Sequence, residues 1–86
     1  MRLRDDGLTR EEIDEEIVVL DLRASNYLEL NGAGALLWKA LEEGSDESPL
    51  ARLLNASYEL EPGAAQRDVD AFLQQLQHAK LIVEDR

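Results

Sequence analysis

The side chains that most often carry out catalysis are scarce in this sequence. His78 is the single histidine and cysteine is absent, so a histidine metal site or a Ser–His or Cys–His nucleophilic pair lacks members. Near the end of a helix, His78 is better explained as a solvated residue favoured by the helix dipole. The sequence therefore argues against catalysis at this residue.

Carboxylates are abundant, with 19 Asp and Glu residues, but paired-carboxylate chemistry needs two of them in one pocket with separated pKa values. Abundance alone does not show that they converge. The segment NGAGA, residues 31–35, precedes a helical pattern as a phosphate loop would, yet it lacks the lysine of a P-loop and the length of a dinucleotide fingerprint. We therefore expect no enzyme, no metal site and no cofactor.

The charge balance bears on possible partners. A formal net charge of -10, from 19 acidic and 9 basic residues, would repel a nucleic-acid backbone. The acidic cluster EEIDEE, residues 11–16, is expected to be a solvated strand and turn, and a docking surface for a basic partner is the alternative reading.

The 86 residues are enough for a single domain with one core. The absence of cysteine suits a reducing cytoplasm, and the longest apolar runs, such as residues 17–20 and 32–38, are far shorter than the roughly 20 residues that cross a bilayer. We expect a cytoplasmic protein without membrane contact, spanning residues 1–86, with little order in residues 1–7.

Three strands are expected in the first part of the chain. Residues 8–13 form a weak strand pattern, the β-branched run EIVVLDL at 16–22 a stronger one, and the alternating YLEL at 27–30 a third. The polar break RASN between the last two indicates a hairpin.

Three helices should follow. Asn31 is the expected N-cap of the first and Gly44 its left-handed stop, while Ser48 and Pro49 are the expected N-cap and first residue of the second. The third should run from Ala64 to Ala79, and residues 81–83 should pack back as an extended tail. The apolar stripes of the first and third helices comprise Gly34, Leu37, Trp38 and Leu41, and Ala65, Val69, Phe72, Leu73, Leu76 and Ala79, respectively. The expected fold is α+β, of winged helix-turn-helix type, with a three-stranded antiparallel sheet followed by three helices.

Winged-helix proteins often bind DNA, but the expected recognition helices carry few cations. The second helix offers Arg52, and the third offers Arg67 and the following Lys80 against two aspartates. A DNA-binding regulator is therefore a weak alternative, and an acidic interaction module is another.

The run VLDLRASNYLELNGAGALLWKAL and the later stretch AAQRDVDAFLQQLQHAKLI resemble the PqqD-like leader-binding domains. These domains are the recognition elements of ribosomally made, post-translationally modified peptides (RiPPs). The resemblance covers about residues 8–84 and is carried by Leu30-Asn31, by Gly34-Ala35 with Trp38, and by Asp68-Val69 with Phe72, Leu73 and Leu76.

The resemblance implies that a precursor's leader peptide adds a strand to the third strand and lies against the third helix. Mapped onto this chain, the strand is residues 26–31 and the helical wall is about residues 67–75. Strand alternation assigns Leu28 and Leu30 to the core side and Tyr27 and Glu29 to the other. The candidate leader-binding residues are Asn26, Tyr27, Leu28, Glu29, Leu30, Arg67, Asp68, Ala71, Phe72 and Gln75. The alternative role of Asp68 is only to stabilise the N-terminus of the third helix through its negative charge. Trp38 is expected to be structural.

Within this family, the stretch LDLRASNYLELNGAGALLW is most similar to stand-alone leader-binding proteins of lasso-peptide pathways. Their partners are a separate leader peptidase and a cyclase, which implies a non-catalytic adaptor that holds the leader and delivers the precursor. The alternative is the peptide chaperone of pyrroloquinoline quinone biosynthesis, which serves a radical enzyme.

Overall fold

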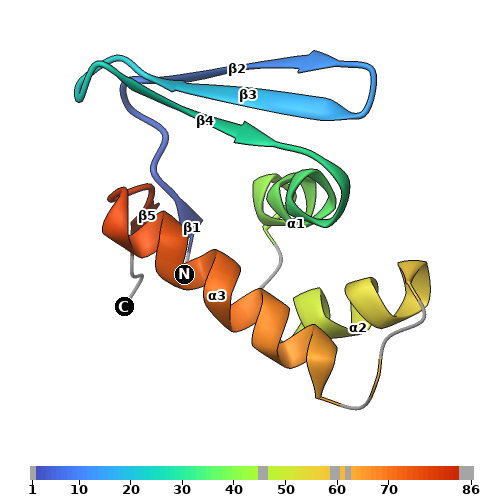
Figure 1. The fold of residues 1–86 in the computed structure, drawn as a ribbon. Coiled ribbons are helices and arrows are strands. Elements are labelled where there is room, and N and C mark those ends of the chain that lie inside the picture. Colours follow the sequence, from blue (N-terminus) through green and yellow to red (C-terminus); the bar gives the residue numbers. More distant parts are fainter. Residues whose placement is uncertain (1, 45–46, 59–60, 62, 84–86) are drawn as a thin grey trace.

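The computed structural model describes residues 2–44, 47–58, 61 and 63–83. Its elements are β1 (Arg2–Leu3), β2 (Leu8–Ile13), β3 (Glu16–Asp21), β4 (Asn26–Leu30), α1 (Gly32–Glu42), α2 (Glu47–Ser57), α3 (Ala64–His78) and β5 (Ile82–Val83). The three helices lie on one side of the sheet β2-β3-β4 and leave its other face open (Figure 1). The expected α+β fold with a three-stranded antiparallel sheet is confirmed.

The sheet places β3 in the centre and leaves β2 and β4 at the edges. Both neighbours of β3 are antiparallel, and the register pairs Val19 with Arg10 on one side and with Leu28 on the other. The β2–β3 hairpin closes through residues 14 and 15, where Asp14 has a φ of 56°. Ile17 and Val19 are buried, so alternate residues of β3 face the helices.

The core lies between the sheet and the three helices. Its buried hydrophobic residues are Ile17, Val19, Leu30, Ala35, Leu37, Trp38, Ala40, Leu41, Leu50, Leu54, Ala65, Val69, Phe72, Leu73, Leu76 and Leu81. Gly34 lies near both neighbouring elements, because a methyl group at its Cα would reach ordinary contact distance, 3.4 Å from Leu30 Cδ2 and 3.9 Å from Phe72 Cε1. The first turn of α1 therefore packs closely between β4 and α3. Trp38 is structural, as expected: it is 2% exposed and its indole Nε1 donates a 3.0 Å hydrogen bond to Glu42.

The helix boundaries differ in detail from those expected. Asn31 occupies the N-cap position of α1, but its side chain makes no capping hydrogen bond. Its carbonyl oxygen accepts hydrogen bonds from the N–H groups of Gly34 and Ala35 instead, and since Asn31 and Gly32 are exposed, water can satisfy the first-turn N–H groups. At the other end, Gly44 has the expected left-handed conformation, with a φ of 94°.

The boundaries of the other two helices also differ slightly from those expected. α2 begins at Glu47, so Ser48 lies inside the helix and the expected N-cap at this residue is wrong. α3 ends at His78, and Ala79 is its exposed C-cap rather than part of the buried stripe. Helix ends depend on one or two backbone hydrogen bonds, which sequence patterns locate only approximately.

The N-terminal segment is the largest departure from expectation. We expected little order in residues 1–7, but Arg2–Leu3 pairs with Ile82–Val83 as a two-stranded antiparallel sheet. The Arg4 N–H donates to the carbonyl of Leu81, and Figure 1 shows β1 beside the C-terminal end of α3. This pairing joins opposite ends of the chain, so no local pattern could indicate it.

Candidate functional site

The open edge of β4 is the first component of the site. The register of β2 and β3 places Gly7 opposite Leu22, and the Leu22 N–H donates a 2.8 Å hydrogen bond to the carbonyl of Gly7. These two residues are therefore a hydrogen-bonded pair of the antiparallel ladder. Bonded and non-bonded pairs alternate along antiparallel strands, so β3 turns the backbone groups of its odd-numbered residues toward β4. It follows that Tyr27 and Glu29 direct their N–H and C=O groups away from the sheet, where an added strand could pair with them.

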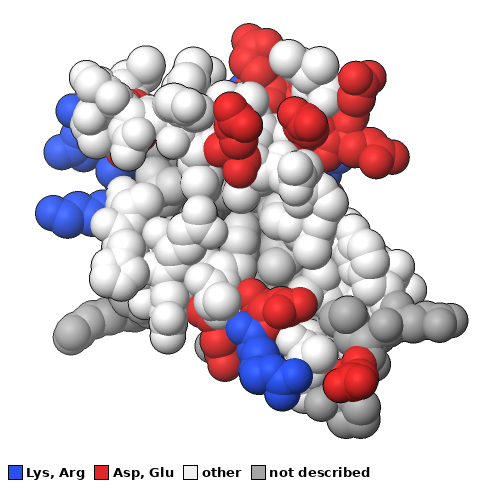
Figure 2. Space-filling model, in the orientation of Figure 1, with Lys and Arg blue, Asp and Glu red and all other residues white. Residues whose placement is uncertain are grey.

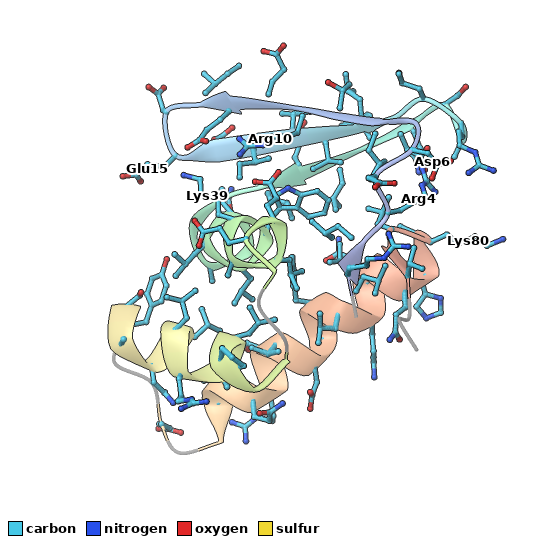
Figure 3. The ribbon with its side chains drawn as sticks, turned by 180° about the vertical axis from the view of Figure 1, so that it is seen from behind. Arg4, Asp6, Arg10, Glu15, Lys39 and Lys80 are labelled. Atoms are coloured by element: carbon cyan, nitrogen blue, oxygen red, sulfur yellow. The ribbon has the colours of Figure 1, made fainter. Side chains whose placement is uncertain are left out.

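The opposite edge, β2, is less suited to accept a strand. Its sequence LTREEI is dominated by charge, which discourages strand pairing at an edge. Arg10 also forms a two-pronged ion pair with Glu42 of α1, at 2.7 and 2.9 Å, and Glu12 pairs with Lys39 of the same helix. Figure 3 shows Arg10 and Lys39 between the sheet and α1. These pairs raise the pKa of Arg10 and lower that of Glu12, through hydrogen bonds to the charged forms.

A pocket of about 140 Å³ lies between β4 and the C-terminal half of α3. Its lining residues are Val19, Asp21, Ala24, Asn26, Tyr27, Leu28, Gln75, Ala79 and Leu81. Four of the candidate leader-binding residues therefore meet here, three from β4 and Gln75 from α3. Leu28 is half-buried on the core side and Tyr27 is 62% exposed, as strand alternation predicted.

The other six candidates lie outside this pocket. Leu30 and Phe72 are core residues, 6% and 7% exposed, that meet beside Gly34. Glu29 is exposed on β4, and Arg67, Asp68 and Ala71 are exposed on α3. On the helix, positions 68, 72, 75 and 79 follow one another along a single flank, of which Gln75 and Ala79 line the pocket.

The sequence analysis missed five residues that line the pocket, namely Val19, Asp21, Ala24, Ala79 and Leu81. Two of them could have been found, because Val19 and Asp21 are the cross-strand partners of Leu28 and Asn26 on the same face. Ala79 follows Gln75 by one helical turn. Ala24 and Leu81 come from a turn and from the chain after α3, where periodicity gives no signal.

Asp21, which lines the pocket, forms a part-buried ion pair with Arg4. Asp21 is only 7% exposed, and its Oδ1 accepts hydrogen bonds from Arg4 Nη2 at 2.6 Å and from the N–H groups of Arg23 and Ala24 at 3.1 and 3.2 Å. Burial tends to raise the pKa of Asp21, but the hydrogen bonds from Ala24 and Arg4 outweigh it and hold the pKa below its ordinary value. Arg4 Nη1 also donates to the carbonyl of Lys80, so this cluster ties β3 to the end of α3.

Asn26 already occupies part of the open edge. Its Oδ1 accepts a 2.9 Å hydrogen bond from the N–H of Tyr27, one of the outward-directed backbone groups. A strand added along β4 would therefore compete with this side chain for the Tyr27 donor.

A second, larger pocket of about 390 Å³ lies between β1, β2 and α1. It includes Arg4 and Arg10, whose guanidinium groups are already paired with Asp21 and Glu42. Within the described part of the chain, no cluster of three or more His, Asp or Glu side chains could hold a metal ion. No helix there is long and apolar enough to cross a membrane.

Comparisons with known proteins agree with this architecture. The chain is similar to TbiB1 in complex with the TbiA(beta) leader peptide, with a TM-score of 0.90 and 28% identity over 100% of this chain and 99% of that one. It is also similar to lasso peptide synthetase B1 complexed with the leader peptide, with a TM-score of 0.84 and 30% identity over 96% of both chains. No curated protein matches the sequence. The profile of the family "Coenzyme PQQ synthesis protein D (PqqD)" matches residues 16–82, and the chain therefore belongs to the PqqD family, as the sequence predicted.

Proposed function

We propose that this protein binds the leader peptide of a ribosomally made precursor in lasso-peptide biosynthesis, by strand addition to β4. The observation that carries the proposal is the pocket between β4 and α3 beside an edge where Tyr27 and Glu29 direct their backbone groups away from the sheet. Two similar proteins in complex with leader peptides support it.

Affinity and specificity would come from different parts of this site. The backbone groups of Tyr27 and Glu29 can each pair with the peptide whatever its sequence, and a typical hydrogen bond of this kind contributes about 0.5–1.5 kcal/mol. A pocket of about 140 Å³ is close to the size of cavities that hold one benzene ring. We infer that it receives one apolar side chain of the leader, which sets the register of the added strand.

The rest of the candidate surface extends the site along the flank of α3. Arg67, Asp68 and Ala71 are exposed there, so they can contact leader residues beyond the pocket. Leu30 and Phe72 would support the groove from beneath, because both are buried against Gly34.

The protein would act as an adaptor rather than as the protease. Strand addition holds the leader by its backbone and leaves the remainder of the precursor free, so that a separate leader peptidase, and then a cyclase, can act on it. A purified preparation should therefore bind leader without cleaving it, and hydrolysis that persists through further purification would contradict the adaptor role.

An amide NMR titration with a synthetic leader, taken from the short precursor gene expected nearby, tests the proposal. Binding should shift the signals of residues 26–31 and of the α3 flank from residue 67 to residue 79. A leader from a pyrroloquinoline quinone precursor, used in parallel, distinguishes the two pathways. The absence of shifts at millimolar lasso leader would refute the proposal.

A further inference from the structure

The outer face of the three-stranded sheet is open and partly apolar. No helix covers this face (Figure 1). Of the five large hydrophobic side chains that the described residues expose, four lie on it: Ile13, Leu20, Leu22 and Tyr27, at 61%, 36%, 66% and 62% exposure. The fifth, Tyr58, follows α2. Exposed large hydrophobic side chains that gather on one face often mark an interaction site.

The strand register shows how these side chains are arranged. Tyr27 and Thr9 flank Leu20 in one row across the sheet, and Leu22 continues along β3 beyond that row. An open hollow of about 260 Å³, lined in part by Leu20, Leu22 and Tyr27, lies at this end of the sheet. Three apolar residues therefore line one part of a recess large enough to receive a protruding side chain, and Asp21, Ser25 and Asn26 line the rest.

Acidic residues border this recess on the side of the β2–β3 hairpin. In the next row across the sheet, Glu11 and Glu29 flank Val18, and Glu16 follows on β3. None of these three carboxylates has an ion-pair partner among the residues that the structure describes. Figure 2 shows acidic side chains gathered over the hairpin end, while the other end is mainly white, with Lys or Arg side chains at the margin of the molecule.

The pattern of charge selects the kind of partner. A second copy of this chain would bring the same carboxylates to a two-fold interface, and like charges opposite one another are unfavourable. Nucleic acids and anionic membranes carry the same sign of charge as the face. The complementary surface is a protein that presents an apolar side chain with Lys or Arg beside it.

We propose that this outer face, defined by Thr9, Glu11, Val18, Leu20, Leu22, Tyr27 and Glu29, is the docking surface for the enzyme that processes the bound precursor. The enzyme would insert an apolar side chain between Leu20 and Leu22 and set a Lys or Arg against Glu11. This inference rests on the proposed function, because it concerns the partner to which the precursor is delivered.

The geometry also explains why docking and leader binding can occur together. Tyr27 and Glu29 turn their side chains to the outer face and direct their backbone N–H and C=O groups to the open edge of β4. An enzyme on the outer face would therefore lie beside the leader without occupying the pocket on the core side. One strand would thus contribute to two adjacent interfaces.

The test measures binding of the purified leader peptidase, encoded beside the precursor gene, to this protein loaded with leader. The variants are the double substitution Leu20→Ser/Leu22→Ser and the single substitution Glu11→Lys, neither of which replaces a residue that lines the pocket between β4 and α3. Tyr58→Ser is the matched control, since it removes an exposed aromatic side chain elsewhere. Thermal melts establish that each variant is folded, and leader titrations measure the first site separately.

We expect the double variant to weaken peptidase binding by about tenfold or more. Glu11→Lys should weaken it most at low salt, while Tyr58→Ser leaves it unchanged and all three variants bind leader as the wild type does. Unchanged peptidase binding by both folded outer-face variants, or no binding by the wild type, would overturn the docking surface. Failure of the wild type to bind leader would instead overturn the proposed function.

Discussion

The direction of the backbone groups on β4 can be tested by replacing Glu29 with proline. Proline removes one N–H and fixes φ, and within a sheet it is tolerated mainly at an edge where that N–H points outward. Because the Glu29 N–H faces away from β3, Glu29→Pro should keep the β3–β4 pairing. Glu29→Ala is the matched control, since it removes the same side chain and retains the N–H.

The expected loss of affinity follows from one missing donor. A leader carbonyl left without its partner on binding costs about 1–3 kcal/mol, and about 1.4 kcal/mol corresponds to tenfold in Kd. The edge is close to solvent, so water can replace part of this hydrogen bond and the lower part of that range applies. We therefore expect Glu29→Pro to bind leader about tenfold more weakly than Glu29→Ala.

Isothermal titration calorimetry of both variants with the same synthetic leader measures this difference. Circular dichroism melts should show that both variants are folded at the titration temperature. If folded Glu29→Pro binds leader as tightly as Glu29→Ala does, the N–H of residue 29 does not pair with the peptide and the assigned strand register is wrong.

Three further changes test the pocket, the buried carboxylate and two glycines. Leu28→Asp, at a half-buried pocket position, should leave the protein folded but weaken leader binding about tenfold or more in fluorescence anisotropy. Phe72→Glu should instead unfold the protein, because Phe72 is 7% exposed. Full-strength leader binding by folded Leu28→Asp would contradict the pocket. The lowered pKa of Asp21 contributes stability that is present above the ordinary value of 3.8 and is lost as the pH falls through the lower value of the folded state. Urea unfolding at pH 6 and pH 3 should therefore show that acid lowers the free energy of unfolding less for Asp21→Asn than for the wild type. Equal decreases in the two proteins would refute this prediction. Gly34→Ala should leave the stability unchanged or raise it by up to about 1 kcal/mol, since the added methyl group reaches ordinary contact distance. Gly44→Ala, at a φ of 94°, should lower the stability by about 1–2 kcal/mol in the same urea assay. The reverse order would contradict the backbone geometry.

Much of the fold was accessible from the sequence, because it depends on neighbours a few residues apart. The alternation of apolar residues in EIVVLDL and YLEL predicted β3 and β4, and placed Leu28 and Leu30 on the covered face. The helical spacing of the third helix predicted the buried positions of α3 apart from Ala79. The order and spacing of these residues were also sufficient to suggest the PqqD family, which the profile match confirms.

The site was predicted only in part, because a groove forms where two elements meet. Asn26, Tyr27, Leu28 and Gln75 line the pocket, but Phe72 does not, since it is 7% exposed and belongs to the core. The choice of residues on α3 depends on how the helix is rotated against the sheet. Periodicity gives the apolar stripe of a helix and not the flank that borders an edge strand.

Only the tertiary structure decided how the ends of the chain complete the site. Arg4 bonds to Asp21, 17 residues away, and to the carbonyl of Lys80, 76 residues away, and β1 pairs with β5. These contacts pair groups that no local pattern links, and in the folded structure they connect the sheet with the C-terminal end of α3. The sequence alone determined the strands of the three-stranded sheet, the three helices and most of their buried positions, because those follow from local periodicity. The pocket beside the open edge exists only once the whole chain has folded, because it lies between β4 and the end of α3, which are distant in sequence.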